Sequence, residues 1–232
     1  MKIIGNGLVA NMFSSYKIDD VMIFASGVSN SSEISEFEFQ RERLLLLDSI
    51  KNNTEKKIIY FSSCGVIDKN NYEIAYYKHK LNMEKIVKKS KNYLIIRLPQ
   101  LLGRKGNTYN KNTIINNFVE KILSGEVIKI QSKASRYVID INDVCVFVKN
   151  YHHLFSNSIL DFANPVNYKA EEIFKIIATV FRVNDAPYEI VDGGSSYELD
   201  LEYLSSLEPS GLVFNFGHSY LQTCLKRSYE NN

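Results

Sequence analysis

Residues 1–27 of the chain are MKIIGNGLVANMFSSYKIDDVMIFASG, and this stretch decides the fold. A short apolar strand, Lys2–Ile4, leads into Gly5-x-Gly7-x-x-Ala10 and a predicted helix. In a dinucleotide-binding turn the first glycine permits the tight bend and the second lets the backbone approach a pyrophosphate. The small third residue packs the helix on the sheet, with the helix N-terminus facing the phosphates. Glycine pairs also occur in plain turns, but the position between strand and helix favours the binding interpretation.

The segment after this turn departs from the usual pattern. A helix is predicted over Leu8–Tyr16, and a new apolar run, Val21–Phe24, begins only about a dozen residues after the helix starts. An acidic residue that holds the ribose is expected ~20 residues after the glycines, at the end of a second strand. Asp19 and Asp20 come too early and precede a strand, so they are better explained as polar residues at its start.

Further along the chain, strand and helix patterns alternate, which predicts an α/β fold with a parallel sheet and helices on both faces. The site of such a sheet lies beyond the carboxyl ends of its strands. The predicted strands are Lys2–Ile4, Val21–Ala25, Lys57–Ser62, Tyr93–Leu98, Val127–Ile130, Ile159–Phe162 and Tyr188–Val191. The predicted helices after the first are a long one that ends near Asn52, with candidate N-caps at 29–32, then Ile74–Ser90, Thr113–Leu123, Asn142–His153, Ala170–Phe181, Leu199–Leu207 and Tyr220–Tyr229.

Composition excludes several function classes. The 232 residues carry a net charge of +2, which gives no reason to expect nucleic acid or an anionic membrane as a partner. No apolar run approaches the ~20 residues that span a bilayer, and the N-terminus has no signal-peptide pattern, so we expect a cytoplasmic protein. Cys64, Cys145 and Cys224 are widely spaced, as expected of reduced thiols, and no metal-ligand spacing is present.

Tyr76 and Lys80 form a Tyr-x-x-x-Lys pair on one face of a predicted helix. An ammonium beside a phenol favours the phenolate, so Lys80 is expected to lower the pKa of Tyr76 from its usual ~10. Such a tyrosine could exchange a proton with a sugar hydroxyl or ketone. One such pair is expected by chance, but a strand ending in Ser62-Ser63 precedes it by about a dozen residues. The three residue types together predict a proton-transfer triad.

At this point a family resemblance becomes definite. Over nearly its whole length the chain resembles an extended short-chain dehydrogenase/reductase of the NAD-dependent nucleotide-sugar epimerase/dehydratase type. The segments that carry the resemblance, in order, are DVMIFASGVS (20–29), IIYFSSCGVI (58–67), YYKHKLNMEK (76–85), IIRLPQLLGR (95–104), RYVIDINDV (136–144) and the closing LDLEYLSSL…SYLQTCLKRSY. Each segment is a weak signal alone, and six in the right order are a strong one.

The resemblance assigns roles to residues at the matching positions. Tyr76 is the general acid/base, and Lys80 holds the nicotinamide ribose. The hydroxyl partner is Ser63 by the spacing to Val66-Ile67, or Ser62 by counting from the strand, and the sequence leaves this open. The cofactor, NAD or NADP, is expected to contact Gly5, Gly7, Leu8, Ser26, Gly27, Tyr76, Lys80 and Pro99.

The resemblance also implies substrate residues. Arg136 would grip the nucleotide diphosphate, because a guanidinium binds phosphate bidentately. Asn112 and Asn116 are candidates for the nucleotide sugar, although asparagines there could equally be turn residues. Gln100 stands where the family usually has asparagine. Cys64 resembles the Ser-Ser-Cys of GDP-fucose synthases, which makes it a substrate candidate, but no histidine follows in 104–110 and a neutral, buried cysteine is favoured.

Compared with the family, the chain lacks roughly 35–40 residues after the first helix. The family sheet order 3-2-1-4-5-6 becomes 1-4-5-6, with the first strand at the edge and no wall to shelter adenosine. The expected organisation is a truncated Rossmann-like core, 1–165, with a substrate-loop insertion near 99–135. A small C-terminal α/β substrate-binding part follows at 166–232.

The leading functional hypothesis is an NAD(P)H-dependent 4-ketoreductase of a nucleotide-activated deoxy-sugar in bacterial capsule or O-antigen synthesis. An epimerase with the same triad is the alternative. A different class is also open: a degenerate relative that binds a sugar nucleotide or a partner without chemistry. Cys64-Gly65 follow Ser63 where 4,6-dehydratases carry Asp-Glu, which argues against that dehydration route. A homodimer is expected through the helices at about 33–52 and 74–90, with Leu44–Leu47 supplying apolar surface.

Overall fold

The computed structural model of the chain describes residues 1–106, 108–109, 112–210 and 214–229. The chain forms two compact units. The first comprises Met1–Leu98, Lys105–Tyr109 and Ile141–Phe162, and the second comprises Pro99–Arg104, Asn110–Asp140 and Ala163–Asn232. The second unit therefore contains most of the insertion that the sequence placed within the core, in addition to the C-terminal part.

A five-stranded parallel sheet forms the centre of the first unit. Its order is β1 (Lys2–Ile4), β2 (Val21–Phe24), β3 (Lys57–Ser63), β4 (Tyr93–Leu98) and β11 (Ser158–Asp161). The predicted α/β class is confirmed, and the strand after the first helix pairs directly with β1, which lies at the edge. The structure adds β11 as a fifth strand beyond the four in the predicted order.

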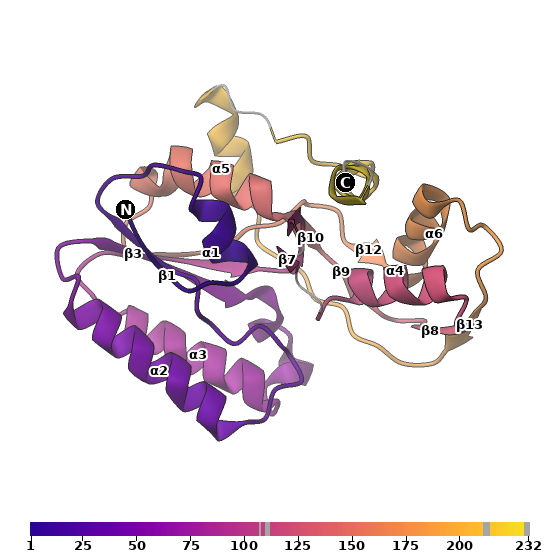
Figure 1. Ribbon diagram of the computed structural model, residues 1–232, viewed down its shortest axis with the longest axis horizontal. Helices are drawn as coiled ribbons and strands as arrows, with labels where there is room; N and C mark the ends of the chain where they lie inside the picture. Colours follow the sequence, from indigo (N-terminus) through magenta and orange to yellow (C-terminus); the bar gives the residue numbers. More distant parts are fainter. Residues whose placement is uncertain (107, 110–111, 211–213, 230–232) are drawn as a thin grey trace. The chain divides into compact units, whose positions relative to one another are not determined.

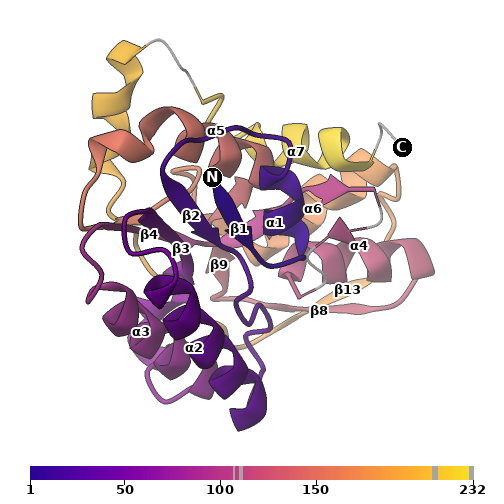
Figure 2. The same ribbon diagram turned by 60° about the vertical axis from the view of Figure 1, so that its left-hand side comes forward.

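Helices cover both faces of this sheet, as Figures 1 and 2 show. The short α1 (Leu8–Phe13) and α5 (Ile141–Tyr151) lie on one face, and α2 (Glu36–Lys51) and α3 (Ala75–Val87) lie side by side on the other. Short 3-10 turns η1, η2 and η3 occupy Cys64–Val66, Lys69–Asn71 and His152–Leu154. This layering places α2 and α3 beside the carboxyl ends of β2 and β3, where the site is expected.

Helix α2 begins later than the sequence predicts. Its N-cap is Ser35, whose hydroxyl accepts a hydrogen bond from the Glu38 backbone N–H at 3.4 Å. Glu36 and Glu38 then place negative charge in the first turn, which stabilises a helix N-terminus. Asn30, within the predicted cap, uses its side chain to accept from the Ser32 N–H in a local turn. The prediction of a cap at 29–32 is therefore wrong.

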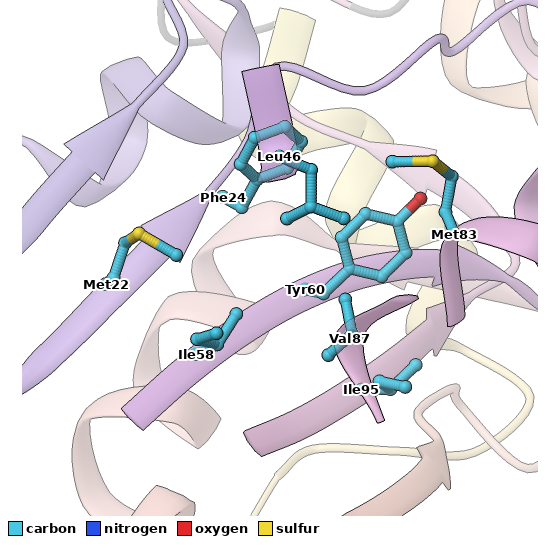
Figure 3. Close-up of a cluster of buried hydrophobic side chains, with 8 residues drawn as sticks. All are labelled: Met22, Phe24, Leu46, Ile58, Tyr60, Met83, Val87 and Ile95. Carbon is cyan, nitrogen blue, oxygen red and sulfur yellow. The ribbon is translucent and has the colours of Figure 1, made fainter. Parts of the chain in front are cut away.

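The core between the sheet and the α2–α3 layer is apolar (Figure 3). Its buried members come from β2, β3, β4 and both helices: Met22, Phe24, Leu46, Ile58, Tyr60, Met83, Val87 and Ile95. Full burial of an aliphatic or aromatic side chain stabilises the folded state by about 1.5–3 kcal/mol. This cluster therefore fixes α2 and α3 against the sheet, and with them the polar side chains that they carry.

The second unit consists of helices and short strand pairs. Its helices are α4 (Ile114–Ser124), α6 (Ala170–Phe181) and α7 (Tyr220–Tyr229), with α6 packed against both of the others. The pairs are β5 (Gln100–Leu102) with β10 (Val138–Asp140), β8 (Ile128–Gln131) with β13 (Tyr188–Val191), and β9 (Ser135–Arg136) with β12 (Tyr168–Lys169). A further pair joins β6 (Arg104–Lys105) to β7 (Thr108–Tyr109), and apart from Arg104 it belongs to the first unit.

One predicted helix has a different form. The segment predicted as a helix over Leu199–Leu207 is a 3-10 turn, η4, over Glu202–Ser210. Ser205 and Ser206 each donate a hydroxyl hydrogen bond to the backbone carbonyl three residues earlier. Such local bonds compete with an α-helical ladder.

Over the described ranges, no helix has both the length and the apolar character that a membrane crossing requires.

Candidate functional site

The glycine turn after β1 has two different glycine requirements. Gly5 has φ +131°, and a Cβ there would lie 2.4 Å from the Ala25 carbonyl oxygen, so no other residue fits without strain. Gly7 is the N-cap of α1 with φ −78°, and a Cβ there would meet nothing within 4 Å. Leu8 and Ala10 are buried and pack the helix on the unit. Gly7 thus presents bare backbone to open space, which suits a pyrophosphate.

Charged side chains from α2 and α3 lie close to the backbone of the turn after β2. A Cβ on Gly27 would lie 2.8 Å from the Lys80 Nζ and 3.1 Å from the Glu42 Oε1. The Ser26 hydroxyl accepts a long hydrogen bond, 3.4 Å, from Arg41. Gly27 is therefore required by the close approach of an ion pair that belongs to α2 and α3.

Tyr76 is 7% exposed and packs with Val28 and Phe39. Its hydroxyl interacts with the Ser63 side chain, which lowers the pKa of Tyr76. The Ser63 hydroxyl also accepts from the Gly65 N–H at 3.2 Å, which caps η1. The end of β3 and the first turn of α3 thus bring together the serine and the tyrosine of the predicted triad.

Ser62 has a different partner. Its hydroxyl donates to Glu84 Oε1 at 2.7 Å, and Arg97 donates to both Glu84 oxygens, from Nε at 2.9 Å and from Nη2 at 2.8 Å. Ser62 and Glu84 are buried. Ser62 therefore belongs to a buried ion-pair network, and the geometry favours Ser63 where the sequence left the choice open.

Lys80 lies one turn after Tyr76 and is only 3% exposed. Its Nζ is 3.2 Å and 3.5 Å from the two oxygens of Glu42, 3.3 Å from the Tyr60 hydroxyl and 5.7 Å from the centre of the Tyr76 ring. Glu42 is fully buried, at 0% exposure. The triad lysine therefore has a direct carboxylate partner.

Sequence reasoning missed Glu42. A signal was present: Phe39, Glu42 and Leu46 lie at the spacing of one helix face, and all three are buried. A glutamate on an apolar face is rarely fully buried unless it is paired. The acidic residue within that face therefore indicated a buried partner, although not which one.

The pKa values of Tyr76 and Glu42 contradict the expectation that the Tyr76 pKa is lowered. Burial and the negative charge of Glu42 raise the pKa of Tyr76, and the hydrogen bond with Ser63 lowers it only partly. Burial also opposes ionisation of Glu42, but Lys80, the His79 hydrogen bond and the Val28 N–H together lower its pKa to about 2. The predicted lowering of the Tyr76 pKa is therefore wrong, because burial raises this pKa and the nearby carboxylate of Glu42 raises it further.

Cys64 is fully buried, and its thiol donates to the Arg97 carbonyl at 3.2 Å. Burial and the charge of Asp161 raise the pKa of this thiol well above its usual range. The favoured interpretation of Cys64 as a neutral buried cysteine is confirmed. Its contact with a substrate stays a prediction, against which this burial weighs.

The other predicted residues lie in the second unit. Arg136 Nη1 donates to the carbonyls of Ser135 and Ser195, at 2.7 and 2.8 Å. Gln100 accepts from the Ile114 N–H at the start of α4, and buried Asn116 accepts from the Tyr229 hydroxyl. Pro99 is half-buried and Asn112 is exposed. The roles of these five residues stay predictions.

Comparison with known families agrees with this fold. A model of the NAD dependent epimerase/dehydratase family matches residues 2–152. The chain belongs to this family. No curated protein matches it. The family match covers all the triad positions and the glycine turn.

Solved structures of the family fold are similar over almost the whole chain. WbmH from Bordetella bronchiseptica in complex with NAD+ is 12% identical with a TM-score of 0.71, covering 96% of this chain and 78% of that one. RMD from Pseudomonas aeruginosa complexed with NADPH is 14% identical with a TM-score of 0.70, and the match covers 97% of this chain and 95% of that one. A UDP-N-acetylglucosamine 4-epimerase from Methanobrevibacter ruminantium is 18% identical with a TM-score of 0.67, and the match covers 97% of this chain and 79% of that one. Likeness at these identities shows the fold.

Proposed function

We propose that this protein is an NAD(P)H-dependent oxidoreductase of nucleotide-activated sugars, and specifically a 4-ketoreductase of a deoxy-sugar intermediate. The observation that carries the proposal is the arrangement of Ser63, Tyr76 and Lys80. The Ser63 side chain interacts with Tyr76, and Lys80 lies one turn later on the same helix face. A serine, a tyrosine and a lysine so placed can deliver a proton to a carbonyl oxygen.

The residues of the first unit fit a dinucleotide. The open backbone at Gly7 and the start of α1 at Leu8 would receive the pyrophosphate, and Gly5 makes the turn possible. Tyr76 and Lys80 would hold the nicotinamide ribose. The cofactor would supply the hydride. Because the sheet ends at β1, adenosine would be more exposed than in a full-length fold, and affinity correspondingly weaker.

Tyr76 has the protonation state that reduction needs. As hydride reaches the carbonyl carbon, the carbonyl oxygen becomes an alkoxide, and the Tyr76 hydroxyl gives it a proton while Ser63 orients both groups. The raised pKa keeps Tyr76 a neutral phenol at neutral pH. An epimerase would begin with proton removal from a hydroxyl, for which a phenolate is better suited. A neutral Tyr76 is consistent with a reduction as the first step, and the epimerase alternative uses the same residues.

Arg136 supports a diphosphate-linked substrate. Two backbone carbonyls fix its Nη1, which holds the guanidinium in place. The rest of its fork has no hydrogen-bond partner among the described residues, and such a fork matches a phosphate. We place the reaction in the cytoplasm, in bacterial capsule or O-antigen synthesis, as the family resemblance implies.

The test is to titrate the protein with NADH and with NADPH and to measure binding by calorimetry. Each titration is done with and without UDP-, GDP- and dTDP-sugars. Binding of either dinucleotide supports the oxidoreductase proposal. If neither binds at millimolar levels in any mixture, the protein is a degenerate relative without cofactor chemistry. If a dinucleotide binds, Tyr76→Phe must abolish turnover and leave binding nearly unchanged. Net oxidation of NAD(P)H separates a reductase from an epimerase, which returns the cofactor to its starting state.

A further inference from the structure

Glu42 is the best-connected buried charge in the first unit. Its carboxylate accepts hydrogen bonds from the Val28 backbone N–H at 2.7 Å and from the Tyr60 hydroxyl at 2.8 Å. It also lies 2.9 Å from His79 Nε2 and 3.2 Å from Lys80 Nζ. These partners come from the turn after β2, from β3 and from α3, whereas Glu42 itself is on α2. A buried carboxylate is stable only with such partners.

The same carboxylate fixes the position of Lys80. The ammonium lies beside both Glu42 and the Tyr60 hydroxyl, which are hydrogen-bonded to each other, and a Cβ on Gly27 would crowd the ion pair. The distance from Nζ to the nearer Glu42 oxygen is 3.2 Å, against 5.7 Å to the centre of the Tyr76 ring. In a buried site the closer opposite charge dominates the field of the ammonium. Lys80 therefore acts on Tyr76 as part of a nearly neutral pair.

We propose that Glu42 is a positioning residue that acts through Lys80: it holds the ammonium in place and balances its charge, so that Tyr76 serves as a neutral proton donor. This inference rests on the proposed ketoreductase function, and it deepens it by naming the group that helps to keep the proton on Tyr76 before the reaction. Glu42 itself touches neither substrate nor cofactor in this scheme.

The groups that surround Tyr76 are consistent with this role. Glu42 faces it from α2, Lys80 from α3 and the Tyr60 hydroxyl from β3. His79, also on α3, stacks on Phe39 and directs Nε2 to Glu42. Glu84 lies further along α3, where Ser62 and Arg97 hold it. Among these described groups, Glu42 is the counter-ion nearest to Lys80.

The experiment follows the protonation of Tyr76 directly. The protein is labelled with tyrosine carrying carbon-13 at Cζ, and the Tyr76 resonance is assigned by its loss in Tyr76→Phe. In the unmodified protein this resonance should stay in the phenol form up to the highest pH at which the fold persists. In Glu42→Gln it should titrate lower by about 1–3 pH units, the effect of one uncompensated charge at this range. Glu38→Gln, an exposed residue of the same helix, should change nothing.

A charge-balanced variant completes the test. Glu42→Gln/Lys80→Met removes both charges and should return the Tyr76 titration towards that of the unmodified protein. If Glu42→Gln does not fold, Glu42→Asp, which keeps the charge but draws it back by one methylene, should shift the titration down by a smaller amount. An unchanged Tyr76 titration in the folded single variant, or no return in the double variant, would overturn the proposal and leave Glu42 a structural residue.

This measurement is independent of turnover, because it needs neither cofactor nor substrate. A shifted titration in a protein that binds no dinucleotide would refute the proposed function and leave the role of Glu42 intact. Turnover with an unshifted titration would refute the role of Glu42 alone. If the proposed function and the role of Glu42 are both correct, the alkaline limb of the pH profile of kcat moves to lower pH in Glu42→Gln. The titration of the Tyr76 resonance moves in the same direction.

Discussion

Ser62 and Ser63 are adjacent at the end of β3, yet they bind opposite ends of the functional face of α3. Ser62 donates to Glu84, and Ser63 interacts with Tyr76, about two helical turns away. Successive side chains of a strand point to opposite faces of the sheet, and Ser63 is also the residue at which β3 ends and η1 begins, so the two serines meet different partners. Two residues of the same type thus acquire different tasks, one structural and one at the proposed reaction centre.

Alanine substitutions should separate these tasks. Ser63→Ala removes the hydroxyl that orients Tyr76, and we expect kcat to fall by about 10²–10⁴, together with about 1 kcal/mol of stability from the lost cap of η1. Ser62→Ala removes one partner of buried Glu84, and we expect a loss of about 1 kcal/mol in unfolding free energy with kcat nearly unchanged. Steady-state kinetics and urea unfolding of the two variants check this. A larger kcat loss in Ser62→Ala would reverse the assignment.

The two glycines of the β1 turn offer a second matched pair. Gly5→Ala places a Cβ 2.4 Å from the Ala25 carbonyl in a left-handed conformation, so thermal stability should fall markedly. Gly7→Ala meets open space at an ordinary φ, so the fold should tolerate it. Because the new methyl occupies the place proposed for the pyrophosphate, dinucleotide affinity should fall. Equal affinity in Gly7→Ala would argue against a phosphate at this turn.

Acid stability should depend on Glu42. Its pKa is lowered from 4.5 to about 2, so the folded state gains stability that is complete above pH 4.5 and is lost as pH falls through about 2. By linkage this gain is on the order of 3 kcal/mol at neutral pH. Glu42→Gln should therefore be less stable than the unmodified protein at neutral pH, and the difference should shrink as pH falls towards about 2. Urea unfolding across this pH range, with Glu38→Gln as the control, measures it.

The homodimer stays a prediction, and α2 shows why it is worth testing. Phe37, Leu44 and Leu47 are 76%, 55% and 40% exposed on this helix, so the leucine run does more than cover the sheet. Apolar side chains at this spacing form one stripe that a second copy could bury. Sedimentation should show a dimer at micromolar concentration, and Leu44→Glu/Leu47→Glu should dissociate it. A monomeric unmodified protein would contradict the prediction.

Much of the fold could be predicted because periodic patterns are local. The predicted bounds of Ala170–Phe181, Tyr188–Val191 and Tyr220–Tyr229 coincide with those of α6, β13 and α7. The position of β1 at the sheet edge followed from a short connection that leaves no room for two more strands. The start of α2 was predicted wrongly because several serines and asparagines in this segment could each cap the helix. Only the tertiary structure selects Ser35 among them.

The sequence alone determined the alternation of strands and helices, the glycine turn, and the presence of Ser63, Tyr76 and Lys80 in a parallel α/β fold. These properties depend on neighbouring residues, whose spacing along the chain is also their spacing in space. The tertiary structure decided which serine meets Tyr76, and it brought Glu42 to Lys80 across 38 residues of chain. The fold also buries Tyr76 beside this carboxylate, and both effects raise the Tyr76 pKa against the lowering expected from Lys80, because the energy of a buried charge depends on the solvent and the charges that the fold places around it.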